Sequence, residues 1–197
     1  MSGEEERRDL ILDAAGRTFG RYGYRKTTVG DIVREAGMAR ATVYKYFSTK
    51  DEMFRAVIDR EVDDIVGTVR AAVEKETTSY DRMRAAIRTH TAALREKANV
   101  FRLTMEALPD VIARTHADSD RVVQEALNLY KWIIEEGVKS GEIAVDDVET
   151  TAWSIILAFK GAFITTVTRQ MPELTERATE NLLDIIWNGL RPREETA

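Results

Sequence analysis

Apolar residues recur every three or four positions along most of the chain, which is the spacing of one face of an α-helix. Alternating β-branched runs of the kind that indicate strands are absent, and proline occurs only at positions 109, 172 and 192. The pattern predicts helices at about 5–22, 28–36, 40–47, 50–75 and 174–190, with others along the apolar stripes at 83–94, 101–108, 123–134 and 150–168. We therefore expect an all-α protein of about nine helices.

The last two predicted helices carry unusually large apolar surfaces. The segment 150–168 is apolar on nearly every side, so it must be buried on nearly every side. The final helix has two apolar edges, one through Ala178, Leu182 and Ile186 and the other through Leu183, Trp187 and Leu190. We expect one edge to face the protein's own core and the other to meet a partner subunit.

A segment near the amino terminus predicts two short helices joined by a tight turn. Thr28 and Asp31 form a capping signature at the first helix, and Gly37 can adopt the left-handed backbone that the turn requires. In the second helix, Val43 and Phe47 lie four residues apart and form its buried edge. A helix pair with this spacing is typical of a DNA-binding helix-turn-helix.

The rest of the second helix is small, polar and basic, a surface that fits the major groove of DNA. An arginine or lysine on such a surface can read the edge of guanine. A third helix begins at Lys50, after a second capping signature formed by Thr49 and Glu52. A positive charge at a helix start opposes the helix dipole, so a phosphate partner would explain Lys50.

Charge is distributed unevenly along the 197 residues, whose net charge is −5. Between Ala14 and Lys50 there are eight Lys or Arg residues against two acidic ones, whereas after residue 50 there are 19 basic against 27 acidic residues. The acidic total alone argues against a nucleic-acid binder, but the local excess of positive charge supports DNA contact through the amino-terminal part.

The inventory of reactive side chains argues against an enzyme. The chain has no cysteine, and His90 and His116 occur in different contexts. No glycine-rich phosphate loop or metal-ligand spacing is present, so we expect no catalytic residue, metal or cofactor. The longest low-charge stretch contains Lys160, and the amino terminus lacks an apolar signal region. We expect no membrane insertion and a cytoplasmic location.

The amino-terminal segment resembles the DNA-binding domain of TetR-type transcriptional repressors. The resemblance rests on ILDAAGRTFGRYGYRKTTV, AGMARATVYKYF and STKDEMF, in about 45 of the 197 residues. It differs from the commonest family wording at Ala41, where glycine is frequent, and at Lys45 and Tyr46, where an aromatic residue and a histidine are frequent. Beyond residue 60 the similarity is one of helix number, length and order.

This resemblance implies a helix-turn-helix DNA-binding domain at 1–49 and a helical effector-binding and dimerisation domain at 50–197, with a linking helix at 50–75. By position, it implies DNA base contacts from Arg40, Ala41, Thr42 and Lys45. It implies DNA phosphate contacts from Thr28, Tyr44, Tyr46 and Lys50. The alternative for each residue is an ordinary solvated or packed side chain.

The carboxy-terminal domain offers candidates for an effector pocket and for a subunit interface. Inward stripes suggest a pocket lined by Met83, Ile87, His90, Phe101, Met105, Tyr130 and Phe159, although such stripes also occur in plain cores. The interface candidates are Trp153, Lys160, Phe163, Leu183, Trp187 and Leu190.

Two charged residues of this domain each allow two interpretations. Lys160 falls among apolar residues on the helical wheel, so its charge needs a partner or a route to water. That partner is a carboxylate of the other subunit or a ligand anion. Glu106 is either a surface carboxylate or a partner for a cationic ligand.

The sequence thus predicts a homodimeric, ligand-responsive transcriptional repressor. It is expected to bind a palindromic operator on double-stranded DNA and to leave it when a small apolar or amphipathic effector binds. The alternative is an architectural or chromosome-associated protein that uses the same helices without a ligand.

Overall fold

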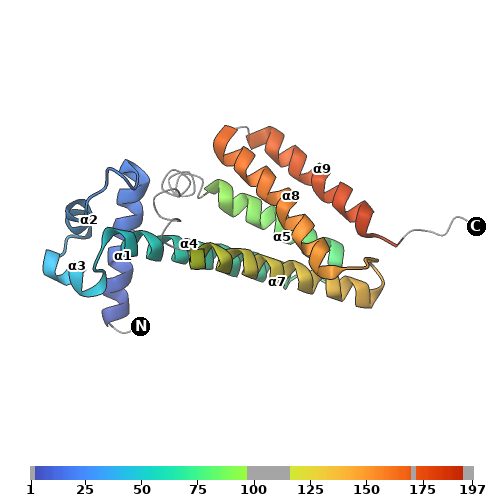
Figure 1. Ribbon diagram of the computed structural model, residues 1–197, viewed down its shortest axis with the longest axis horizontal. Helices are drawn as coiled ribbons and strands as arrows, with labels where there is room; N and C mark the ends of the chain where they lie inside the picture. The colour runs from blue at the N-terminus through green and yellow to red at the C-terminus, as the bar shows by residue number, and fades with distance from the viewer. Residues whose placement is uncertain (1–2, 97–115, 170–171, 193–197) are drawn as a thin grey trace, which may run out of the picture. The chain divides into compact units, whose positions relative to one another are not determined.

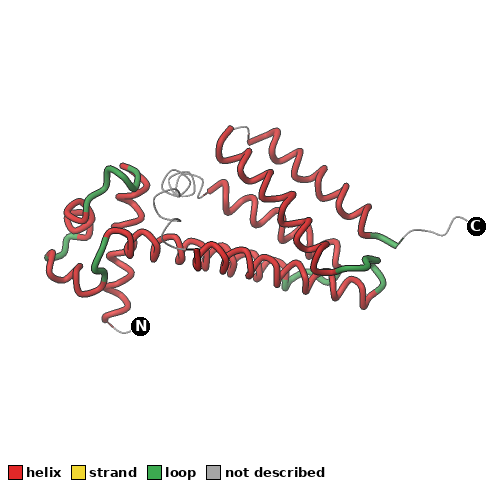
Figure 2. The backbone as a smooth tube through the Cα atoms, viewed as in Figure 1, coloured by secondary structure: helices red, strands yellow, loops and turns green. Residues whose placement is uncertain are grey.

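The computed structural model describes residues 3–96, 116–169 and 172–192. Eight helices and no strand lie within these ranges, which confirms the all-α prediction (Figure 1, Figure 2). The helices are α1 (Gly3–Tyr22), α2 (Val29–Ala36), α3 (Arg40–Tyr46), α4 (Lys50–Val73), α5 (Ser79–Glu96), α7 (His116–Ser140), α8 (Val148–Arg169) and α9 (Pro172–Leu190). The helix expected around 101–108 lies outside the described residues. None of the described helices is both long enough and apolar enough to cross a bilayer.

The chain divides into two compact units, and the boundary between them falls within α4. Among the described residues, the first unit holds the chain up to Asp63 together with residues 116–118. The second holds Asp64–Glu96 and the chain from Ser119 onwards. The first turns of α4 therefore belong with the amino-terminal helices.

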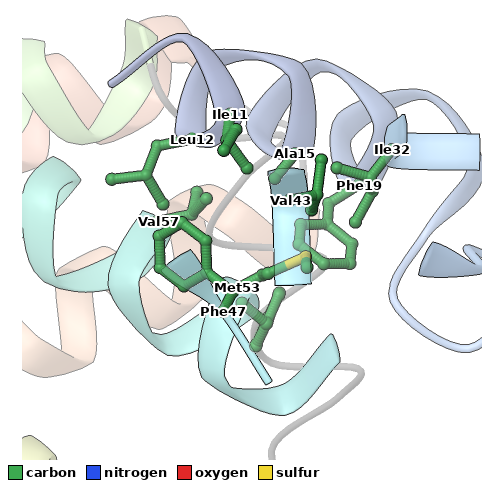
Figure 3. Packing of buried hydrophobic residues seen from close by; sticks show 10 residues of the cluster. Ile11, Leu12, Ala15, Phe19, Ile32, Val43, Phe47, Met53 and Val57 are labelled. Carbon is green, nitrogen blue, oxygen red and sulfur yellow. The ribbon is translucent and has the colours of Figure 1, made fainter. Parts of the chain in front are cut away.

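A single core holds α1, α2, α3 and the start of α4 together (Figure 3). Its buried members are Ile11, Leu12, Ala15, Phe19, Ile32, Val43, Phe47, Met53, Phe54 and Val57. The rings of Phe19 and Phe54 meet edge to face, with centroids 5.1 Å apart, a favourable aromatic geometry. The two side chains that α3 gives to this core, Val43 and the flanking Phe47, fix which side of the helix points outward.

The helix ends in this unit follow the predicted chemistry. The Thr28 hydroxyl accepts from the Asp31 amide while the Asp31 carboxylate accepts from the Thr28 amide, so the capping box at α2 is confirmed. Gly37 ends α2 with φ of 63°, the left-handed conformation that glycine adopts without strain. At the start of α4, the Glu52 amide donates to the Thr49 hydroxyl at 3.1 Å.

In the second unit, α5 packs against α8 and α9, which also pack against each other. Its largest fully buried side chains include Met83, Ile87, Ile133, Ile134 and Leu183. This core joins helices that are far apart in the sequence, so it fixes the faces that each helix presents.

A close approach between α5, α7 and the turn after α7 occurs at Gly137. A Cβ atom at this position would lie 2.5 Å from Ile143 Cδ1 and 2.8 Å from Ser79 Oγ. The Ser79 amide donates to the Glu142 carboxylate at 2.9 Å. Glycine at 137 is therefore needed for space and not for an unusual backbone conformation, since it lies within α7.

Polar side chains also cap two helices of the second unit. The Thr78 hydroxyl accepts from the Asp81 amide at 3.1 Å at the start of α5. The Asp147 carboxylate accepts from the Thr150 amide at 3.0 Å at the start of α8. Adjacent polar residues can accept from the same unpaired amides at a helix start, and the backbone path into the helix decides which of them is the N-cap.

Candidate DNA-binding surface

The outward face of α3 presents the residues predicted to contact bases. Val43 is fully buried and anchors the helix, whereas Arg40, Ala41 and Lys45 are exposed and Thr42 is partly exposed. Because a short helix with one buried edge exposes the rest of its circumference, these side chains project together from one rigid support. Such a surface can enter a major groove about 12 Å wide.

Arg40 and Tyr44, one turn apart on α3, hold each other in place. The Arg40 guanidinium donates to the Tyr44 hydroxyl at 3.2 Å, and its central carbon lies 5.5 Å from the centre of the Tyr44 ring. A cation over an aromatic face gains a modest stabilisation at an exposed site. The pair reduces the conformational freedom of an arginine that is predicted to contact bases.

Lys50 at the start of α4 is tied to the turn between α1 and α2. Its ammonium group donates to the carbonyl oxygens of Tyr24 at 3.0 Å and of Thr27 at 3.1 Å, and it lies 4.3 Å from the centre of the Tyr24 ring. The Tyr24 hydroxyl donates to the neighbouring Asp51 carboxylate. These contacts give the positive charge of Lys50 internal partners. They explain a lysine at this position, and the sequence alone did not predict them. A phosphate contact by Lys50 stays a prediction.

The Thr28 hydroxyl, another predicted phosphate contact, is engaged in the capping box. It donates to the Asp31 carboxylate at 2.6 Å and accepts from the Asp31 amide at 3.2 Å. Hydrogen bonds from the Thr28 side chain and backbone lower the pKa of Asp31, because they stabilise its charged form. The capping box gives both the Thr28 hydroxyl and the Thr28 amide an internal partner, and a phosphate contact by Thr28 stays a prediction.

The predicted pocket residues lie in the second unit with different degrees of burial. Met83, Ile87 and Tyr130 are buried, and Phe159 is partly exposed. His90 keeps some solvent contact, yet the apolar atoms around it lower its pKa by disfavouring the charged ring. Burial likewise raises the pKa of the Tyr130 hydroxyl. Phe101, Met105 and Glu106 lie outside the described residues.

The structure reverses part of the predicted subunit interface. Leu183 and Leu190 were expected at a partner, but both are buried in their own protomer, so they have no apolar surface left to offer. The Trp187 ring packs against Tyr80, with centroids 5.1 Å apart. Trp153 is partly exposed, whereas the side chains of Lys160 and Phe163 lie outside the described ones.

Among the described side chains of the same two helices, the large apolar ones that are exposed are Leu157 on α8 and Ile185 on α9. They are 63% and 60% exposed, respectively. Large apolar side chains with this much exposure on packed helices are candidates for contact with another protein surface.

Comparison with known proteins identifies the family of this chain. A model described as "Bacterial regulatory proteins, tetR family" matches residues 11–57. The chain is 33% identical over 190 residues to the HTH-type transcriptional activator FasR of Mycolicibacterium smegmatis, covering 94% of this chain and 84% of that protein. The chain belongs to the TetR family. It is also 26% identical to the transcriptional repressor KstR2 of Rhodococcus jostii, over 96% of this chain and 93% of that protein.

Solved structures show the TetR-family fold over nearly the whole chain. A TetR regulator from Haloarcula marismortui superposes with a TM-score of 0.82 at 20% identity, covering 95% of this chain and all of that one. The regulator FadR from Bacillus subtilis, solved in complex with stearoyl-CoA, gives a TM-score of 0.74 at 20% identity, covering 93% of this chain and 99% of that one. This chain is therefore a helix-turn-helix DNA-binding transcriptional regulator of the TetR family.

The sequence analysis did not select the residues of α1 that lie beside α3 in the DNA-binding unit. The amino end of α1 lies beside α3, and Glu4 and Arg7 line a groove with Thr42, Lys45 and Tyr46. The available signal was the pair of adjacent arginines at positions 7 and 8, near the start of an amphipathic helix.

Proposed function

We propose that this protein is a homodimeric transcriptional repressor that binds a palindromic operator and is released from it by a small amphipathic effector. The orientation of α3 carries this proposal: Val43 is buried while the polar and basic residues around it face outward. Base readout by Arg40 and Lys45 would contribute roughly 1–3 kcal/mol of discrimination for each well-formed contact. Two such helices in a dimer would read half-sites about one helical turn, or a multiple of it, apart.

The exposed apolar side chains of α8 and α9 support the homodimer. Leu157 and Ile185 are largely exposed in the protomer, and a two-fold interface would pair the same patch on both subunits. We expect Ile185→Glu to yield a monomer in light scattering after size exclusion, because the charge would be buried without a partner. Val138→Glu, at an exposed apolar position on α7, is the matched control and should leave the dimer intact.

The class of effector is suggested by the relatives. FadR of Bacillus subtilis has this fold and was solved with stearoyl-CoA, and the chain is 24% identical over 133 residues to a fatty acid metabolism regulator protein of the same organism. Met83 and Ile87 of α5 are buried in the second unit, and a ligand with a hydrocarbon chain would need apolar side chains of this kind around it. We therefore place long-chain acyl compounds first among candidate effectors.

The proposed route of response is α4, which contributes to both compact units. Its amino end carries Met53 and Val57 in the core of the DNA-binding unit, and its carboxyl end carries the buried Val69 and Val73. An effector that shifts this helix would change the separation of the two DNA-binding heads. Coupling energies of this kind are typically about 1–3 kcal/mol.

Thermal shift and DNA binding together test the effector. Stearoyl-CoA at 100 times its Kd should stabilise the protein by about 2.7 kcal/mol and weaken its binding to a duplex selected from a random library. Coenzyme A without an acyl chain is the control and should do neither. DNA binding that is indifferent to acyl-CoA, free fatty acids and other small apolar compounds would contradict the proposal and favour a ligand-independent architectural protein.

A further inference from the structure

The amino end of α1 and the exposed side of α3 form the two walls of an open groove. Its volume is about 430 Å³, and its lining residues are Glu4 and Arg7 from α1, Met38 and Ala39 from the turn, and Thr42, Lys45 and Tyr46 from α3. The groove lies within the first compact unit, so its walls are fixed relative to each other by the shared core.

Two positive charges on this groove have no carboxylate partner among the described residues. Arg7 and Lys45 are both exposed, and neither forms an ion pair with a carboxylate among the described residues. Nearby arginines are engaged: Arg8 lies 5.3 Å from the centre of the Phe47 ring, and Arg17 pairs with Glu35 at 2.8 Å. In the part of the chain that the structure describes, the two cations on this groove are therefore free of a carboxylate partner.

The position of the groove identifies what would occupy it. Three of its lining residues belong to α3, so the groove continues directly from the surface that enters the major groove. The major groove of DNA is bounded on both sides by sugar-phosphate backbone. When Lys45 faces the base edges, the opposite wall with Arg7 faces the backbone beside the half-site. Arginine suits this position because its planar fork can donate two hydrogen bonds to one phosphate.

We propose that Arg7 binds a DNA phosphate next to the bases read by α3, so that the amino end of α1 extends the footprint of each helix-turn-helix. Glu4 on the same wall opposes this contact by repelling the phosphate and so limits affinity. The contact adds affinity and sets register but carries no base preference. It rests on DNA binding by the family and not on the proposed effector response.

Salt dependence of DNA binding distinguishes a phosphate contact from a structural role. The full-length protein and its variants are titrated by fluorescence anisotropy into a duplex selected from a random library, between 50 and 200 mM salt. Arg7→Ala should reduce the slope of log K against log salt by about 0.9 for each head bound, so that this salt increase weakens the variant about 3-fold less per head than wild type. Arg7→Lys should keep the slope, and Glu4→Gln should tighten binding.

Two controls separate the outcomes. Arg21→Ala removes an exposed arginine from the far end of the same helix and should leave the slope unchanged. On a duplex trimmed to end at the half-sites, wild type and Arg7→Ala should bind equally, because the flanking phosphate is missing. A wild-type protein that binds DNA with the same slope and affinity as Arg7→Ala overturns this contact alone. A wild-type protein that selects no duplex overturns DNA binding itself, and this contact with it.

Discussion

Replacing Lys50 with alanine tests how the DNA-binding unit is held together. The Lys50 ammonium donates to two backbone carbonyls, at 3.0 Å to Tyr24 and at 3.1 Å to Thr27. Hydrogen bonds from charged donors contribute roughly 1.5–3 kcal/mol each, and this partly exposed site loses some of that to competition with water. We therefore expect Lys50→Ala to lower the free energy of unfolding by about 1–3 kcal/mol for the pair of bonds.

Thermal unfolding followed by circular dichroism measures this loss. For a chain of this length, 1 kcal/mol corresponds to about 2–4 °C in Tm, so Tm should fall by about 2–12 °C. Lys26→Ala, at an exposed position in the same turn, is the matched control and should change stability by no more than about 0.5 kcal/mol. An unchanged Tm for Lys50→Ala would refute the anchoring role.

The salt slope of DNA binding separates this role from the one predicted from the sequence. If Lys50 also contacts a phosphate, Lys50→Ala should reduce the slope by about 0.9 for each head bound. A lower Tm with an unchanged slope would assign the lysine to the fold alone.

Three other predictions follow from the packing and the charges. Gly137→Ala should lower the free energy of unfolding by up to about 2 kcal/mol, measured by urea unfolding, because overpacking of about 1–3 kcal/mol outweighs a helix-propensity gain of about 1 kcal/mol. Gly67→Ala is the control and should be stabilising, because the added methyl group meets open space. Thr28→Ala should cost about 1 kcal/mol and raise the pKa of Asp31 toward its ordinary value in an NMR titration. Because the folded-state pKa of Asp31 is lowered, its contribution is present above the ordinary pKa and is lost as the pH falls through the lowered one. The folded-state pKa of His90 lies below its ordinary value of 6.5, so the Tm of the wild type should decline as the pH falls below 6.5. The Tm of His90→Gln should decline less over the same pH range. Equal declines would contradict the burial of the ring.

The local features of this fold could be predicted from the sequence because they depend on neighbouring residues. The capping box of Thr28 and Asp31, the turn at Gly37 and the buried edge of Val43 all follow from spacing within a few positions. The outward face of α3 follows as the complement of that buried edge.

Features set by distant residues could not be predicted in this way. The partners of Lys50 are backbone carbonyls 23 and 26 positions away, and nothing in the residue types at those positions identifies them. Both edges of α9 are apolar, so the sequence shows that both need cover but not which one faces inward. Packing against α5 and α8 buries Leu183 and leaves Ile185 exposed.

The most direct test of the central claim is sequencing of genomic DNA fragments bound by the purified wild-type protein and by Lys45→Ala. The orientation of α3 predicts that wild type enriches a palindromic motif with half-sites one helical turn, or a multiple of it, apart, and that Lys45→Ala loses preference at particular bases within each half-site. Fragments without a shared motif, or a motif that the variant selects as sharply as wild type, would contradict the claim that this surface reads DNA.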